Sequence, residues 1–124
     1  MIIGIGVDSI EISRVVKAME KEHFIHRIFT EREILQLDSN KRRGASDFAG
    51  KEAVVKALGT GFVGIEAADI EILRNDKGAP YIVLQGTAKE YAEKMGIIEW
   101  KISITNTKEL ATAFVVALGG DVRD

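Results

Sequence analysis

The sequence predicts an α+β fold in one domain that spans residues 1–124. Two observations indicate this class. A first apolar strand is followed by helical spacing and capping signals as far as residue 61, and then by paired strands, one helix and another pair of strands. Apolar residues at 48–58 make most of a helix surface hydrophobic, so we expect that helix to lie deep in the fold.

The composition excludes several classes of function. A formal net charge of −2 lacks the basic excess that is typical of nucleic-acid binding. Without cysteine the chain has no disulfide and no thiol nucleophile. No apolar run approaches the roughly 18 residues of a membrane span, and we find no signal peptide. We therefore expect a cytoplasmic protein that binds neither nucleic acid nor membrane.

The chain opens with a short apolar run at residues 2–7, which predicts a buried strand ending at Asp8. Asp8 has two interpretations. It is an N-cap that forms a capping box with Glu11, or it is a metal-binding carboxylate beside Gly6, whose missing side chain lets a ligand approach.

A helix follows, and its core-facing positions have helical spacing: Ile12, Val15, Val16 and Met19. Basic residues lie roughly along another face, at Arg14, Lys17 and Lys21. This stripe is either a solvated face or a docking surface for an acidic partner helix.

Thr30 and Glu33 form a capping box, which predicts a helix from Glu31 to about Leu37. A polar loop at residues 38–45 leads to the central helix. The cations of this loop, at positions 41–43, are solvated or reach a phosphate.

Ser46 or Asp47 is expected to cap the central helix, and Gly59 and Gly61 end it, because glycine adopts a left-handed cap without steric cost. The Gly-Thr-Gly sequence at 59–61 differs from a phosphate-binding loop, in which the glycines precede the helix and its positive end faces the phosphate.

This largely apolar helix carries the charges Lys51, Glu52 and Lys56. Glu52 and Lys56 are four positions apart, which favours an ion pair on the helix surface. The alternative is a metal–phosphate site, in which a carboxylate binds a divalent cation and the lysines neutralise phosphate oxygens.

The rest of the chain predicts a hairpin, a helix and a second hairpin. Strands are expected at 69–74, 81–84, 98–104 and 111–118, with Pro80 at the start of the second. A capping box at Thr87 opens a helix that ends at Gly96. Because several strands are apolar on both faces, we expect a homo-oligomer.

Four short segments, in this order, resemble the holo-[acyl-carrier-protein] synthase family of small bacterial 4′-phosphopantetheinyl transferases. The resemblance covers residue 3 to about residue 116. Its segments are Gly-Val-Asp at 6–8, Arg-Ile-Phe-Thr at 27–30 with Glu33, Phe-Ala-Gly-Lys-Glu-Ala at 48–53 with Lys56, and Ser-Ile-Thr-Asn-Thr at 103–107.

The resemblance implies a compact 4′-phosphopantetheinyl transferase fold, in which a small antiparallel sheet packs with helices and the chains assemble as a trimer with active sites between subunits. It also implies an Mg²⁺-dependent enzyme of fatty acid biosynthesis. Such enzymes move 4′-phosphopantetheine from coenzyme A to a serine of apo-acyl carrier protein and release adenosine 3′,5′-bisphosphate.

Roles for individual residues also follow from the resemblance. It implies that Asp8 and Glu52 bind the metal. It also implies that Asp8, Glu52 and Lys56 are the catalytic residues. Lys56, Glu52 or a metal-bound water accepts the serine proton. The stripe Arg14, Lys17 and Lys21 docks the carrier protein. Coenzyme A is expected to contact Lys51, Lys56, Gly59, Thr60, Gly61, Pro80, Ser103, Asn106 and Thr107.

Asn106 departs from the family pattern, which commonly has histidine at this position. Asn106 has two interpretations: it is a turn residue, or its side-chain amide faces a coenzyme phosphate. The departure also supports an alternative function, a non-catalytic module that binds coenzyme A or acyl carrier protein.

Overall fold

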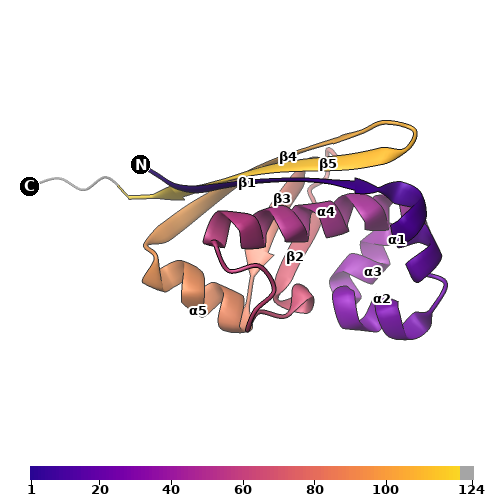
Figure 1. Cartoon of the computed structure of the whole chain (residues 1–124), viewed down its shortest axis with the longest axis horizontal. Coiled ribbons are helices and arrows are strands. Elements are labelled where there is room, and N and C mark those ends of the chain that lie inside the picture. Colours follow the sequence, from indigo (N-terminus) through magenta and orange to yellow (C-terminus); the bar gives the residue numbers. More distant parts are fainter. Residues whose placement is uncertain (121–124) are drawn as a thin grey trace, which may run out of the picture.

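The computed structural model describes residues 1–120 and confirms the α+β class (Figure 1). The prediction of one small sheet is replaced by two antiparallel sheets. Strands β1 (Ile2–Glu11), β5 (Leu110–Gly119) and β4 (Ile97–Asn106) form one sheet in that order. Strands β2 (Ile70–Arg74) and β3 (Pro80–Leu84) form the other. The two sheets meet where β3 lies near β4.

The helix α4 lies along one face of the three-stranded sheet, with α1 to α3 near one end and α5 near the other (Figure 1). No helix among residues 1–120 has the length and apolar character needed to cross a membrane. The helices are α1 (Ile12–Ala18), α2 (Glu22–Ile28), α3 (Glu31–Leu37), α4 (Lys41–Leu58) and α5 (Gly86–Lys94), with a short 3-10 helix η1 at Ala67–Asp69.

Small residues on β1 and β5 let α4 approach the sheet closely. A Cβ atom on Gly6 would lie 1.9 Å from the carbonyl oxygen of Ala53, and one on Gly4 would lie 2.2 Å from that of Ala57. On β5, Ala113 and Ala117 are fully buried. Helix and strand backbones are therefore nearly in contact, which corrects the expectation that Gly6 makes room for a ligand.

The strand β1 extends beyond the predicted residue 7 because β5 supplies partners as far as Glu11, which pairs with Leu110. Asp8 thus lies within the strand, opposite Ala113. Glu11 precedes α1 without a side-chain cap. The interpretation of Asp8 as an N-cap with a capping box at Glu11 is therefore wrong.

The helix α4 starts at Lys41, earlier than expected, because Asn40 caps it by accepting a hydrogen bond from the Arg43 amide at 3.2 Å. Most of the predicted polar loop is therefore helical. Ser46 and Asp47 lie inside the helix and are buried, so both predicted caps are wrong. The expected end is confirmed, because Gly59 is the C-cap with a φ of +78°.

The remaining boundaries follow the predictions with two exceptions. The capping box of Thr30 and Glu33 is present, and Pro80 is the first residue of β3. No side chain caps α5, so the capping box at Thr87 is wrong. Asn106 is the last residue of β4 and pairs with Ala111, whereas the prediction placed it in a turn.

Candidate active site

Asp8 and Lys56 meet where β1 crosses α4. The Lys56 ammonium lies 3.1 Å from Asp8 Oδ1 and also donates to the Val7 carbonyl at 3.0 Å. Lys56 therefore forms its ion pair across the fold, not with Glu52 on its own helix as one interpretation expected. The Lys56 side chain is 52% exposed and that of Asp8 is 14% exposed, so this pair lies at the edge of solvent.

The other carboxylate oxygen of Asp8, Oδ2, is buried and has no hydrogen-bond partner. A buried acceptor without a partner is costly, because the group has lost its water and gained nothing in exchange. The same cost disappears when a cation or donor occupies the site. Asp8 Oδ2 is therefore the atom of this cluster that is best placed to accept a cation or a hydrogen-bond donor.

Glu52 completes the cluster from the adjacent turn of α4. Burial raises the pKa of its carboxyl group, the nearby Asp8 raises it further, and Lys56 opposes both effects. Two carboxylates with one lysine carry an excess of negative charge, which suits a divalent cation with oxygen ligands. The residues fit Mg²⁺, with Asp8 and Glu52 as its candidate carboxylates. Residues 1–120 contain no group of three or more potential ligands from His, Cys, Asp and Glu.

Lys51 lies outside this cluster, although it precedes Glu52 in the chain. Its ammonium is fully buried, lies 2.8 Å from Glu33, and donates to the carbonyls of Ala67 and Ile70. All three N–H donors are thus used inside the fold. Burial lowers the pKa of Lys51, and Glu33 opposes that shift. The expected contact of Lys51 with coenzyme phosphates stays a prediction, which this arrangement does not support because the ammonium is buried and already paired.

Glu33 has two structural roles, since it completes the capping box of α3 and forms the ion pair with Lys51. Its Oε1 atom accepts from the Thr30 amide at 3.0 Å, and its Oε2 atom accepts from the Ile72 amide at 2.9 Å. Burial raises the pKa of Glu33, and Lys51 lowers it. The motif residue Glu33 therefore holds α3, α4 and β2 together.

Asp47 forms a second buried ion pair, with Arg74 at the end of β2. The atoms Asp47 Oδ1 and Arg74 Nη1 are 2.7 Å apart but lie off the hydrogen-bonding direction. Burial raises the pKa of Asp47 to about 7, although Arg74 acts in the opposite sense. Sequence analysis did not identify Arg74, because a single arginine at a strand end carries no local signal.

A basic pocket of about 370 Å³ opens beside this pair. Asn106 reaches it from β4 and donates its side-chain amide to the Ser46 hydroxyl at 2.7 Å. Of the predicted coenzyme contacts, only Pro80 and Asn106 line this pocket. The full lining is Asn40, Arg42, Arg43, Ser46, Arg74, Gly78, Pro80, Ile104 and Asn106.

Ser103 and Thr107 are not brought into the basic pocket. Ser103 pairs with Phe114 on the sheet face that points away from α4. The Thr107 hydroxyl accepts from the amides of Glu109 and Leu110, so it stabilises the turn between β4 and β5. For Thr107 the structure supports a structural role.

The loop after α4 contains the other predicted coenzyme contacts. Gly59 and Gly61 both have positive φ angles, of 78° and 59°, and no atom would obstruct a Cβ at either position. The Thr60 hydroxyl donates to the Gly61 carbonyl at 2.7 Å. The glycines therefore serve the backbone turn, and both are exposed.

The predicted docking stripe lies on and just after α1. Arg14, Lys17 and Lys21 are all exposed, and Arg14 is 4.0 Å from Glu11. Beside Arg14 runs a groove of about 680 Å³. Phe24 and Phe48 form its aromatic wall, with ring centroids 6.2 Å apart.

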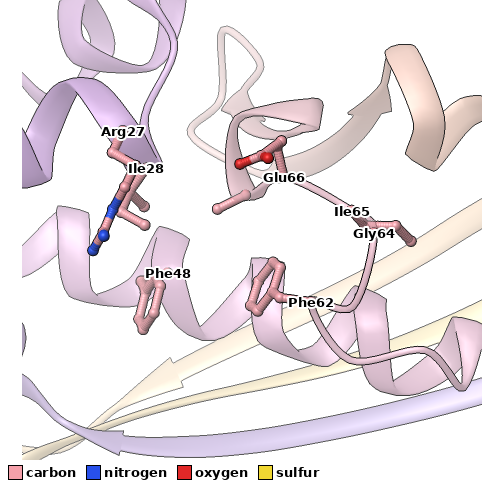
Figure 2. Close-up of a pocket in the computed structure, with 8 residues that line it drawn as sticks. Arg27, Ile28, Phe48, Phe62, Gly64, Ile65 and Glu66 are labelled. Carbon is pink, nitrogen blue, oxygen red and sulfur yellow. The ribbon is translucent and has the colours of Figure 1, made fainter.

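Phe48 also lines a smaller pocket of about 270 Å³, which is separate from this groove (Figure 2). Figure 2 shows the rings of Phe48 and Phe62 on the α4 side, with Arg27 and Glu66 across from them. Sequence analysis did not predict this pocket.

Comparisons with known proteins show the family of this chain. Residues 4–115 match the model of the 4′-phosphopantetheinyl transferase superfamily. A holo-[acyl-carrier-protein] synthase of Lachnoclostridium phytofermentans is 51% identical over 116 residues, covering 94% of this chain and 95% of that protein.

Two solved structures are also similar. The holo-[acyl-carrier-protein] synthase of Helicobacter pylori in complex with coenzyme A is 32% identical, with a TM-score of 0.83 over 92% of this chain and 99% of that one. The Bacillus anthracis holo-(acyl-carrier-protein) synthase in complex with CoA (3′,5′-ADP) is 34% identical, with a TM-score of 0.79 over 97% and 99%. This chain therefore belongs to the 4′-phosphopantetheinyl transferase superfamily, and within it to the holo-[acyl-carrier-protein] synthases.

Proposed function

We propose that this protein transfers the 4′-phosphopantetheine group of coenzyme A to a serine of apo-acyl carrier protein. The cluster of Asp8, Glu52 and Lys56 carries the proposal, with the unpartnered oxygen of Asp8 as its central observation. The names of the relatives support the same reaction. In this reaction the serine oxygen bonds to the phosphorus that carries pantetheine, and the bond from that phosphorus to adenosine 3′,5′-bisphosphate breaks.

Asp8 and Glu52 would hold Mg²⁺, which when bound would supply positive charge beside the pyrophosphate. Lys56 is half exposed beside these carboxylates, so its ammonium can neutralise a phosphate oxygen or the leaving group. The strand β1 and the helix α4 hold all three side chains on regular elements. This rigidity supports the alignment that in-line transfer requires.

The direct test is incubation of the protein with coenzyme A, Mg²⁺ and apo-acyl carrier protein, followed by mass spectrometry of the carrier. We expect the mass increment of one phosphopantetheine group, and its loss when a chelator removes the metal. Circular dichroism before and after chelation is the control for folding. A folded protein that leaves the carrier unmodified at saturating Mg²⁺ contradicts the proposal.

We assign the nucleotide end of coenzyme A to the basic pocket. Its three arginines suit phosphate groups, and Pro80 and Asn106 line the same space. Ser46 of this pocket and Glu52 of the carboxylate cluster are about 120° apart around α4, at about 100° per residue. The two sites therefore face different directions on one chain, which favours a coenzyme bound between two subunits.

A homotrimer agrees with the outer face of the three-stranded sheet. Ile5, Val7 and Phe114 are 61%, 54% and 45% exposed, and Val7 lies directly opposite Phe114. A contiguous apolar surface of this kind is typical of subunit interfaces. Sedimentation equilibrium at micromolar concentration tests the trimer, and a monomer would contradict it.

The cytoplasmic location stays a prediction.

The exposed stripe of Arg14, Lys17 and Lys21 is the proposed docking surface for the acidic recognition helix of the carrier protein. Because these side chains are exposed, their attraction is screened by salt. Charge reversal of Lys17 to Glu should raise the KM for the carrier but leave the KM for coenzyme A unchanged. Equal changes in both constants would argue against a docking role.

A further inference from the structure

Arg74 differs from the other two arginines of the basic pocket. Arg42 donates to the carbonyl of Lys108, and Arg43 donates to the carbonyl of Gln36. Both of these arginines are exposed. The Arg74 side chain is only 12% exposed, and its Nη1 atom has no hydrogen-bond partner among residues 1–120. Arg74 is therefore the buried cation of this pocket, and it has a donor that the fold does not use.

The backbone of Arg74 is fixed at the end of β2. The Gln36 side chain on α3 accepts from the Arg74 amide at 2.7 Å and donates to the Arg74 carbonyl at 3.0 Å. The guanidinium is held differently, because its contact with Asp47 at 2.7 Å lies off the hydrogen-bonding direction. A misaligned pair lacks the strength of an aligned, charge-assisted bond. The Arg74 guanidinium can therefore turn towards an anion in the pocket without breaking a formed bond to Asp47.

We propose that Asp47 competes with a bound phosphate for Arg74, and so sets the affinity of the basic pocket for the nucleotide end of coenzyme A; the inference rests on the proposed transferase function. Asp47 is 2% exposed and does not itself line the pocket. Its carboxylate cancels part of the positive charge that a phosphate meets there. When a proton neutralises that carboxylate, the full charge of Arg74 faces the pocket. Asp47 is therefore a positioning residue that acts through Arg74.

The charge of Asp47 changes close to neutral pH, because burial raises its pKa to about 7. Its charged neighbours come from three elements: Arg74 on β2 and Lys51 on α4 favour the carboxylate, and Glu33 on α3 opposes it. Lys51 and Glu33 are paired with each other, so Arg74 is the neighbour that a ligand can engage. The nearby side chain from β4, Asn106, is neutral.

The sign of the pH effect follows from linkage. A phosphate that draws Arg74 away removes the cation that stabilises the Asp47 carboxylate and adds negative charge nearby. Both changes raise the pKa of Asp47, so binding takes up a proton. Binding through Arg74 should therefore become tighter as pH falls through about 7.

The test measures the affinity of the whole protein for adenosine 3′,5′-bisphosphate by calorimetry at pH 5.5 and pH 8. Asp47→Asn has no charge at either pH and imitates the protonated group. We expect it to bind the bisphosphate about fivefold more tightly than wild type at pH 8, and within about twofold of wild type at pH 5.5. The ligand phosphates also titrate at about pH 6, but both proteins meet the same ligand at each pH.

Proton uptake gives a readout that a merely structural role of Asp47 would not change. Calorimetry at pH 7.5 in two buffers of different ionisation enthalpy counts the protons taken up on binding. Wild type should take up a fraction of a proton more than Asp47→Asn does. Equal uptake by the two proteins would contradict the linkage to Asp47.

Asp76→Asn is the matched control, since it removes the same charge from an exposed position two residues after Arg74. It should change the affinity by less than about twofold at either pH, because solvent and salt screen an exposed charge. The double variant Asp47→Asn/Arg74→Met tests the route through Arg74 and leaves neither member of this pair charged. It should bind the bisphosphate about tenfold more weakly than Asp47→Asn. Circular dichroism at each pH checks that every variant is folded.

The proposal is overturned if Asp47→Asn gains no affinity at pH 8, if its gain is as large at pH 5.5, or if the double variant binds as tightly as Asp47→Asn. Such a result leaves the proposed function intact when wild type still modifies the carrier. The proposed function fails separately, when wild type leaves the carrier unmodified. The affinities for the bisphosphate are measured without the carrier, so they decide the role of Asp47 in either case.

Discussion

Lys51 and Glu52 are neighbours in α4 but belong to two charge clusters that are built differently. Lys51 is fully buried, and each of its three N–H donors has an acceptor. Glu52 is partly exposed beside Asp8, whose Oδ2 atom has no partner. A buried group with all its hydrogen bonds made contributes to holding the fold, whereas one with an unmet bond is suited to a ligand.

The difference between the clusters comes from helix geometry. Successive residues point about 100° apart, so Lys51 faces α3 and β2, whereas Glu52 faces the edge of the sheet near Asp8. A pattern of charges on one helix can therefore serve two purposes. The predictions below alter one cluster at a time and measure both stability and transfer.

The largest effect on stability is expected from Lys51→Met, which leaves Glu33 buried without its cation. Breaking a buried pair from one side costs about 3–5 kcal/mol. Urea denaturation should show this loss in the free energy of unfolding. The affinity of the folded protein for coenzyme A should stay within about twofold, since Lys51 reaches no ligand.

The double variant Lys51→Met/Glu33→Gln is the control for this loss. Glutamine carries no charge, but its single oxygen can accept from only one of the amides of Thr30 and Ile72, which different oxygens of Glu33 serve. One lost hydrogen bond costs about 1–3 kcal/mol, which is less than the cost of a buried charge without its partner. We therefore expect the double variant to be more stable than Lys51→Met alone. A double variant that is less stable than the single one would show that the lost hydrogen bond to the backbone outweighs the unpaired charge of Glu33.

Glu52→Gln should have the opposite result, a large effect on transfer and a small one on stability. Loss of a proposed metal ligand should lower kcat/KM by about 100-fold, or about 2.7 kcal/mol. The free energy of unfolding should not fall, because burial and Asp8 disfavour the charged form of Glu52 in the folded protein. Steady-state transfer assays and urea denaturation measure the two quantities, and Glu90→Gln on the exposed surface of α5 is the control.

Asp47 gives the buried charges of α4 an effect on stability that depends on pH. Its pKa is about 7 in the folded protein and 3.8 as the ordinary value, so between these pH values the folded state holds a proton that the unfolded state has lost. Stability from this group is therefore fully present below about pH 3.8 and declines as pH rises towards 7.

The variant Asp47→Asn should remove that decline. Its free energy of unfolding should rise relative to wild type, by on the order of 1–2 kcal/mol, as pH increases from 4 to 7. Thermal or urea unfolding across this range measures the difference. A constant difference would mean that Arg74 keeps Asp47 charged throughout, so that Asp47 resembles an ordinary ion-pair partner.

Local patterns predicted the parts of the fold that depend on local physics. The capping box at Thr30 and the glycine cap at Gly59 involve only nearby backbone groups, and both are present. The start of α4 was missed because Asp47 was interpreted as a cap. Its actual partner, Arg74, is distant in the chain, so no local signal indicated that Asp47 is buried.

In the candidate site too, contacts between distant segments could not be predicted from local sequence patterns. Family resemblance brought Asp8, Glu52 and Lys56 together, and the structure places Asp8 against Lys56. Helical spacing alone favoured a Glu52–Lys56 pair, which does not form. Whether a charge on a helix meets solvent or a buried partner depends on the elements packed around it, and for Lys51 these are α3 and β2.

The smallest effect is expected at Asn106, which combines a hydrogen bond inside the fold with a place in the basic pocket. Its amide bonds the Ser46 hydroxyl, as a structural residue would, but it also lines the basic pocket. Asn106→Ala should weaken coenzyme A binding by a few-fold, about 0.5–1.5 kcal/mol for one hydrogen bond, and leave kcat unchanged.

Asn106→His should bind coenzyme A more tightly as pH falls through about 6.5, since only the imidazolium forms a charge-assisted bond to phosphate. Neighbouring phosphates would raise the histidine pKa and extend this gain to higher pH. The measurement is coenzyme A affinity from pH 5.5 to 8.5, with Ser46→Ala as the control that breaks the internal bond but keeps the amide. If the histidine variant follows the wild-type pH profile, Asn106 faces no phosphate and its role is the bond to Ser46.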